Sequence, residues 1–175
     1  MAEHQSARDG DTRSVKMAES EIKTEFLFEV KIPQGPHHLI GDGPLGTRRI
    51  TYPGSGATVQ GPRLNGTVLA GGGDPFLLRT DGVGEVDARI TIQADEGDLI
   101  MMSYKGLLVY GQKYLDAQAR GEVGPQDENY FYVSVLFETA SERYRWLNAT
   151  VAVARGFIPE DLPPPCIGYR VYALI

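Results

Sequence analysis

The sequence predicts an all-β protein, a single antiparallel β-barrel of about eight strands with one or two short helices. Several segments alternate apolar and polar residues with a period of two, which is typical of half-buried strands. The turns between them contain Asp-Gly sequences, and these residues accept the positive φ angles of tight hairpins. Strands do not alternate with long helices, and closure into a barrel would leave no exposed sheet edge.

Length and composition indicate one domain. The chain has 175 residues, 42% of them hydrophobic, which is enough for one buried core. Residues 22–175 are expected to form this domain. Residues 1–21 are expected to be a disordered tail, because their few apolar side chains cannot offset the conformational entropy lost on ordering.

Charge and cysteine content restrict the partners and the compartment. The formal net charge is -6 and basic residues do not cluster, so we expect no nucleic-acid partner and no anionic membrane partner. No apolar run approaches the roughly 20 residues of a membrane-spanning helix. Cys166 is the only cysteine, which excludes an internal disulfide and fits a reducing compartment, so a cytoplasmic location is expected.

The first strand is expected to begin near Thr24. Its apolar residues at alternate positions are predicted to share one face: Phe26, Phe28, Val30 and Ile32. Pro33 and Pro36 interrupt backbone pairing, so residues 37–40 can form at best an edge strand.

Two tempting motifs in this region do not predict a cofactor. His37 and His38 are adjacent, and neighbours in an extended chain point to opposite faces, so they cannot chelate one metal ion together. Residues 41–46 match the dinucleotide pattern G-x-G-x-x-G. However, Pro44 lies inside the motif and a β-branched, strand-like segment follows it where a helix is required. We therefore expect a loop there, and neither a metal nor a nucleotide cofactor.

The central residues 71–106 predict a β-meander. Its strands are expected at residues 76–80, 85–94 and 99–105, joined by turns at Asp81-Gly82 and at Asp95-Glu96-Gly97.

The C-terminal part predicts one helix and three further strands. Residues 112–120 contain good helix formers and end at Gly121, a suitable C-cap. Residues 130–139 alternate sharply between a wholly apolar face and an aromatic and polar face, and further strands are expected at 144–155 and 166–175.

Several motifs occur in a recognisable order. They are Gly61-Pro62-Arg63-Leu64-Asn65-Gly66-Thr67-Val68-Leu69, Gly71-Gly72-Gly73-Asp74, Asp81-Gly82, Asp87-Ala88-Arg89, Gly97, Gly106, Phe137-Glu138-Thr139 and Arg143-Tyr144-Arg145-Trp146-Leu147-Asn148. This order resembles the bacterial and fungal domain-of-unknown-function family 3237, also called uncharacterised protein family 0311, over about residues 26–172. The resemblance implies a single-domain antiparallel barrel, similar to calycin-like and allene-oxide-cyclase-like barrels, and supplies no established catalytic residues. Pro75 stands where the family pattern usually has Trp.

Four residues are the candidate catalytic groups: Asp74, Asp87, Arg89 and Tyr104. Asp74 follows three glycines, whose backbone can approach a ligand closely, and a partly buried carboxylate is suited to proton transfer. A turn of two or four residues around positions 96–97 would place Arg89 beside Tyr104 with Asp87 on the same face, whereas a three-residue turn would flip this pairing. The alternatives are a surface ion pair of Asp87 with Arg89 and a turn-capping role for Asp74.

Five more residues are candidate substrate-binding groups: Arg63, Tyr132, Glu138, Trp146 and Asn148. Arg89 or Arg63, with Tyr104 or Tyr132, is expected to support the Asp74 carboxylate. The alternative for Trp146 and Asn148 is core packing with a satisfied amide. For Tyr132 and Glu138 the alternative is a face turned to solvent or to a second copy of the chain.

The sequence therefore predicts a cofactor-independent enzyme that acts on an aromatic or polyketide-like small molecule. A carboxylate would serve as general acid or base in a lyase, isomerase or cyclase reaction, and an arginine or tyrosine would stabilise a developing oxyanion. The alternative is a non-catalytic barrel that binds such a molecule. Assembly into a homodimer remains open.

Overall fold

The structure is a computed structural model that describes residues 21–122, 124–163 and 165–175. The disordered tail predicted for residues 1–21 lies outside the described residues except for Glu21. Within them are ten strands, one α-helix and one 3-10 helix: β1 (Thr24–Gly43), β2 (Gly46–Pro53), β3 (Thr58–Gln60), β4 (Gly66–Val68), β5 (Leu77–Arg79), β6 (Gly84–Ala94), β7 (Leu99–Val109), α1 (Gln112–Ala119), β8 (Tyr130–Glu138), η1 (Arg145–Ala149), β9 (Ala152–Phe157) and β10 (Cys166–Leu174).

Eight strands form a closed antiparallel ring, as predicted. The order is β1, β10, β9, β8, β7, β6, β4 and β3. The pairing of β3 with β1 closes the ring. The predicted meander is also present, because β5 pairs with β6 and β6 pairs with β7. Closure satisfies the backbone groups that an open sheet would leave at its edges.

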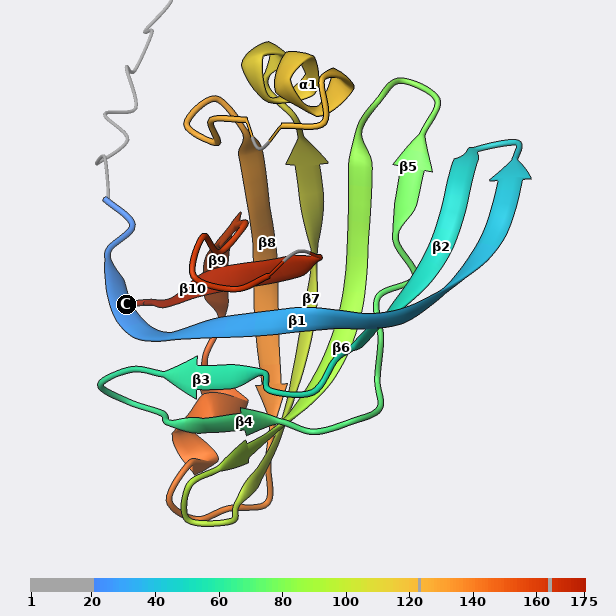
Figure 1. Cartoon of the computed structure of the whole chain (residues 1–175). Helices are drawn as coiled ribbons and strands as arrows, with labels where there is room; N and C mark the ends of the chain where they lie inside the picture. The colour runs from blue at the N-terminus through green and yellow to red at the C-terminus, as the bar shows by residue number, and fades with distance from the viewer. Residues whose placement is uncertain (1–20, 123, 164) are drawn as a thin grey trace, which may run out of the picture.

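Two additional strands widen one end of the ring. The C-terminal half of β1 leaves β10 and pairs with β2, while β5 joins β2 to the start of β6. In Figure 1 the hairpin of β1 and β2 leans outward beside β5, and α1 lies at the same end of the barrel. Residues of β2 and of the segment before β5 line the cavity described below.

The barrel interior is filled by the inward positions of each strand. Along β6, buried and less buried residues alternate from Gly84 to Ala94, as the pleat requires. Phe28, Ile92, Ile100 and Met102 are fully buried. Burying each of these side chains contributes about 1.5–3 kcal/mol to the free energy of unfolding, relative to leaving it exposed. They belong to one buried hydrophobic cluster, which is the packed core of the barrel.

The first strand shows why a face prediction can fail. Its register shifts between Phe26 and Phe28, and both Leu27 and Phe28 are buried while Phe26 is exposed. The prediction that Phe26 shares the inner face was wrong, since a β-bulge inserts one residue and reverses the alternation before it.

The proline-rich part of β1 behaves largely as predicted. The register shifts again between Gln34 and His37, around Pro36, and His37 onward pairs only with β2. The glycine-rich residues 41–46 form the end of this hairpin. The predicted loop is therefore a hairpin turn, and the segment that follows is a strand.

The predicted helix is confirmed by α1, and Gly121 follows it with φ +76°.

The strand predicted for residues 144–155 begins later in the structure. Residues 145–149 form η1, and β9 begins only at Ala152. Side-chain hydrogen bonds explain the difference: Asn148 bonds the backbone N-H and C=O of Thr139, each at 2.8 Å, and so holds the chain in a local turn.

Candidate functional site

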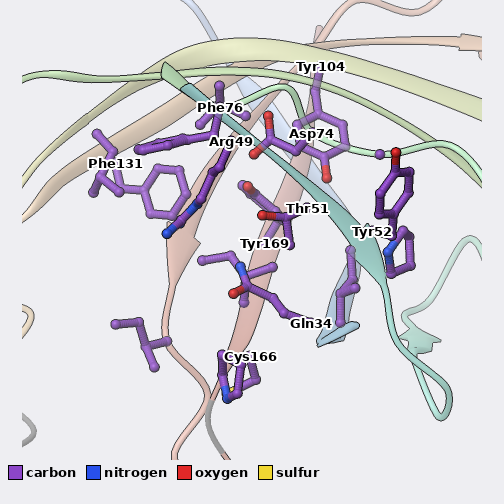
Figure 2. A pocket seen from close by; sticks show the side chains of 18 of the residues that line it. Gln34, Arg49, Thr51, Tyr52, Asp74, Phe76, Tyr104, Phe131, Cys166 and Tyr169 are labelled. Atoms are coloured by element: carbon purple, nitrogen blue, oxygen red, sulfur yellow. The ribbon is translucent and has the colours of Figure 1, made fainter. Parts of the chain in front are cut away.

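The wider end of the barrel encloses a cavity of about 370 Å³ (Figure 2). This volume is at the small end of the range of about 300–1,000 Å³ that is usual for small-molecule sites. Seven aromatic side chains line it: Tyr52, Phe76, Tyr104, Tyr110, Tyr114, Phe131 and Tyr169. Among the described lining residues, Asp74 is the only carboxylate and Arg49 the only guanidinium or ammonium group.

Backbone pairing between β2 and the segment before β5 places Asp74. The N-H groups of Thr51 and Asp74 donate to each other's carbonyl oxygens at 3.0 and 2.8 Å. Two residues along, the Arg49 N-H donates to the Phe76 carbonyl at 3.0 Å. Because side chains two apart in extended chain share a face, these four residues form one wall of the cavity.

Glycines allow this wall to cross β6 closely. Gly73 pairs with Arg89, and the two exchange backbone hydrogen bonds of 2.9 and 3.0 Å. Gly72 has φ +76°, and a Cβ atom there would lie 2.1 Å from the Arg89 carbonyl oxygen. The glycines were predicted to let the backbone approach a ligand closely; here they let it approach the protein's own strand β6.

The Asp74 carboxylate accepts a backbone hydrogen bond from β6 at a position where no neighbouring strand is paired on that side. Its Oδ1 atom accepts a hydrogen bond of 3.1 Å from the Asp87 backbone N-H, at a point on β6 between the residues paired with β5 and those paired with β4. One oxygen is thus fixed by the sheet. The carboxylate lies on the cavity wall, where a ligand can reach it.

The environment raises the pKa of Asp74 to about 6. Burial is the main cause, because it disfavours the charged form. The Asp87 N-H and the Arg49 charge oppose this rise, while the Asp87 carboxylate adds to it. At neutral pH Asp74 can therefore both lose and regain a proton, as a general acid or base requires.

Two tyrosines form the part of the wall beside Asp74. The rings of Tyr104 and Tyr169 are tilted, with centroids 5.0 Å apart, and both residues are buried. Burial, followed by the charge of Asp74, raises the pKa of Tyr104 well above its usual value. Burial also raises the pKa of Tyr169 well above its usual value, so both phenols stay neutral at physiological pH.

A second aromatic pair closes the cavity on the side of the helix. The rings of Tyr110 and Tyr114 are stacked, 4.8 Å apart and 6° from parallel. Tyr114 and Gln118 lie four residues apart on α1, so the same helix face presents both to the cavity. Burial raises the pKa of Tyr110, and the nearby Arg49 charge lowers it in part.

A second cavity of about 480 Å³ adjoins the first. The two share five lining residues: Leu108, Tyr110, Phe131, Ile158 and Ile167. Its other walls are charged, but Lys31 already pairs with Asp161 and Arg170 with Glu29. The first cavity holds the half-buried carboxylate of Asp74 among mainly aromatic walls, and this combination makes it the stronger candidate site.

Comparison with known proteins identifies the family. The family model described as "Protein of unknown function (DUF3237)" matches residues 22–174. The chain belongs to this family. A protein of uncharacterised family 0311 from Clostridium acetobutylicum is 32% identical over 143 residues, which cover 81% of this chain and 90% of that protein.

Other DUF3237 relatives agree on the fold. A β-barrel-like protein from Acinetobacter baumannii has a crystal structure with a TM-score of 0.75 and 29% identity, covering 89% of this chain and 98% of that one. The hydroalkoxylation enzyme phnH of Penicillium herquei is 28% identical over 129 residues, covering 73% of this chain and 70% of that enzyme. One relative of this DUF3237 protein is therefore a hydroalkoxylation enzyme.

The structure separates the four predicted catalytic residues into two groups. Asp74 and Tyr104 line the cavity, whereas Asp87 and Arg89 point outward from β6. Asp87 forms an ion pair of 2.9 Å with Lys105. The expected pairing of Arg89 with Tyr104 was wrong: Ala88 faces Tyr104, and Arg89 faces Ser103.

The length of one turn explains this error. Ala94 donates its N-H to the Asp98 carbonyl at 2.9 Å, which leaves a three-residue turn between them. Such a turn shifts the register by one residue relative to a two- or four-residue turn, and a shift by one moves every side chain to the other face.

The five predicted substrate-binding residues do not line the cavity. Arg63 pairs with Glu25 at 2.6 Å, and its guanidinium stacks 4.5 Å from the Trp146 ring, beside η1. Asn148 holds the turn at Thr139, as described above. Tyr132 and Glu138 are exposed on the outer face of β8. The packing alternative therefore describes Trp146, which packs against the core, whereas Asn148 has a satisfied amide but is exposed. The outward-face alternative describes Tyr132 and Glu138.

Sequence reasoning missed the residues that complete the cavity. These residues come from β2, α1, β10 and the connection between β7 and α1: Arg49, Thr51, Tyr110, Tyr114 and Tyr169. The signal that was available was the strand-like segment 47–52, in which alternation assigns Arg48 and Arg49 to opposite faces.

The described part of the chain contains no candidate metal centre. It contains no group of three or more His, Cys, Asp or Glu side chains that could hold an ion. None of the helices in that part is long and apolar enough to cross a membrane.

Proposed function

We propose that this DUF3237 protein is a cofactor-independent enzyme that cyclises a small aromatic or polyketide-like molecule by proton transfer at Asp74. One observation carries the proposal: a single carboxylate, with no ion-pair partner among the described residues, lines a cavity whose other walls are mainly aromatic. Aromatic walls hold a planar substrate, and the carboxylate is the group able to move a proton within it.

The reaction that fits best is the addition of a substrate hydroxyl across a carbon-carbon double bond of the same molecule. Protonated Asp74 gives its proton to one alkene carbon while the substrate hydroxyl oxygen forms a bond to the other carbon. The hydroxyl proton then passes to the Asp74 carboxylate. No atom is gained or lost by the substrate, and Asp74 returns to its protonated form, so the step needs no oxidant, reductant or cofactor.

The surrounding residues support this chemistry. A carboxyl group with a pKa of about 6 exchanges a proton readily near neutral pH. The Arg49 guanidinium can stabilise charge that develops on the substrate oxygen, and Tyr104 can donate a hydrogen bond. The similarity to the Penicillium hydroalkoxylation enzyme supports the same reaction class.

Cyclisation in D₂O tests the proposal. The probe is a naphthol that carries a dimethylallyl group next to its hydroxyl, and mass spectrometry follows the ring-closed product with one added deuterium on carbon. We expect the parent protein to form this product and Asp74→Asn to form it about 10²-fold more slowly. Asp95→Asn, in the exposed turn between β6 and β7, is the matched control.

Two outcomes would contradict the proposal. Turnover by Asp74→Asn at the rate of the parent would remove Asp74 from the chemistry. Binding of the probe without any product or deuterium incorporation would favour the alternative function, a barrel that only binds its ligand.

A further inference from the structure

Arg49 is the one cationic side chain on the cavity wall among the described residues. The backbone of β2 fixes its position through the hydrogen bond from its N-H to the Phe76 carbonyl. The guanidinium carbon lies 4.9 Å from the centroid of the Phe76 ring, so the aromatic face orients the charged group. Figure 2 shows the Arg49 side chain running toward Phe131.

The guanidinium donors of Arg49 are available. The hydrogen bonds and ion pairs among the described residues do not include this guanidinium group, in contrast to the adjacent Arg48, which donates to the Pro75 carbonyl at 2.6 Å. A guanidinium presents five N-H donors in a planar fork that matches a carboxylate or another oxygen anion. An arginine held over a cavity with its donors unused is suited to bind a ligand anion.

The walls around Arg49 determine the shape of that ligand. The stacked Tyr110 and Tyr114 rings form a flat surface, and Phe76 and Phe131 line the same cavity. Flat aromatic surfaces favour planar ring systems over branched aliphatic chains. Asp74 has one oxygen already bound to the Asp87 N-H and would repel a second anion, so the anionic group is expected at the Arg49 end.

Resting on the proposed function of this cavity, we propose that its ligands are planar aromatic anions whose ionised oxygen is bound by Arg49. The oxygen belongs either to an acidic phenol or to a carboxylate attached to the ring system. Arg49 is then the residue that determines specificity, and Asp74 acts on a neutral part of the same molecule.

Calorimetry with two matched pairs of probes tests this assignment at pH 7.5. The first pair is 2-naphthoate and naphthalene-2-carboxamide, and the second is 2,4-dinitro-1-naphtholate and its methyl ether. Each pair compares an anion with a neutral molecule of similar shape, and the two pairs distinguish a carboxylate from a phenolate. We expect the parent protein to bind at least one anion about 10-fold or more tightly than its neutral partner.

Two substitutions identify the residue responsible. Arg49→Met should remove most of the preference for the anion while changing the affinity for the neutral probe less than about threefold. Arg49→Lys, which keeps the charge but loses the planar fork, should lie between the two. Arg145→Met is the control, because it removes an exposed guanidinium from η1 outside the cavity. Circular dichroism and melting temperature confirm that each variant is folded.

The outcomes are distinct from those that test the proposed function. Equal affinity of the parent for the anion and the neutral probe of both pairs, absence of binding, or an unchanged preference in Arg49→Met would overturn the inference. Asp74→Asn should bind the anion at least as tightly as the parent, because a repelling charge is lost. If the parent forms no cyclised product but still prefers the anion in a way that depends on Arg49, the cavity binds aromatic anions without catalysing the cyclisation.

Discussion

Replacing Asp74 with Asn is expected to stabilise the protein at neutral and alkaline pH. Asn keeps the size of the side chain and an oxygen that can accept the hydrogen bond from the Asp87 N-H. The substitution removes a carboxylate whose charged form is less favourable in the folded protein than in the unfolded chain, because burial disfavours the charge. The variant should therefore be more stable and less active than the parent, which is the pattern of a strained functional site.

The magnitude follows from the pKa. The environment raises the pKa of Asp74 from 3.8 to about 6 in the folded protein, and each tenfold change in an acid constant corresponds to about 1.4 kcal/mol. The charged carboxylate therefore costs at most about 3 kcal/mol of the free energy of unfolding. For a protein of this size, that corresponds to a rise in melting temperature of at most about 6–12 °C when the charge is removed.

The sign depends on which state binds more protons. Below pH 3.8 Asp74 is protonated in both the folded and the unfolded chain, so it contributes no pH dependence. Between pH 3.8 and about 6 the folded state holds more protons, and the free energy of unfolding falls as pH rises. Above about pH 6 the full penalty is present.

Urea unfolding followed by circular dichroism at pH 4, 6 and 8 measures this dependence. The stability of Asp74→Asn relative to the parent should be near zero at pH 4 and increase to a maximum at pH 8. Asp95→Asn reports the effect of removing one exposed carboxylate. If Asp74→Asn is less stable than the parent at pH 8, Asp74 is a stabilising turn cap and the reasoning from burial is wrong.

Two further predictions concern the segments that hold the site and the opposite end of the barrel. Gly72→Ala should lower the free energy of unfolding by about 2 kcal/mol or more, because its Cβ would lie 2.1 Å from the Arg89 carbonyl oxygen. Gly71→Ala is the control, since a Cβ there meets open space. Similar melting temperatures for the two alanine variants would contradict the close crossing. Asn148→Ala should lower the free energy of unfolding by about 1–3 kcal/mol in urea titrations, since both of its 2.8 Å hydrogen bonds to Thr139 are lost, and a change below about 0.5 kcal/mol would show that the turn holds without them.

The elements that the sequence predicts well are those with local causes. The alternation in residues 130–138 and the glycine after α1 lead directly to β8 and to the end of the helix. The turns of the central meander are likewise encoded by residues next to each other in the chain. These features need no knowledge of distant contacts, and the closed antiparallel ring follows from their number and type.

The candidate site was predicted only in part, because its geometry depends on distant pairings. Asp74 carried a local signal in the three preceding glycines. Arg49 became recognisable only once Thr51 was seen to pair with Asp74, 23 positions further along the chain. The outward position of Arg89 depended on a turn of three residues, and one residue of register decides the face of a whole strand.

The position of Asp74 is costly in two independent ways, and both costs point to a ligand. Its backbone approach requires glycines at positive φ, and its side chain is half-buried without an ion-pair partner among the described residues. A carboxylate needed only to complete the hydrogen bonding of β6 could be replaced by a strand residue, whose carbonyl would bond the Asp87 N-H without a charge. A proton-transferring group, in contrast, must be ionisable, reachable from the cavity and poised near neutral pH, and Asp74 meets all three conditions.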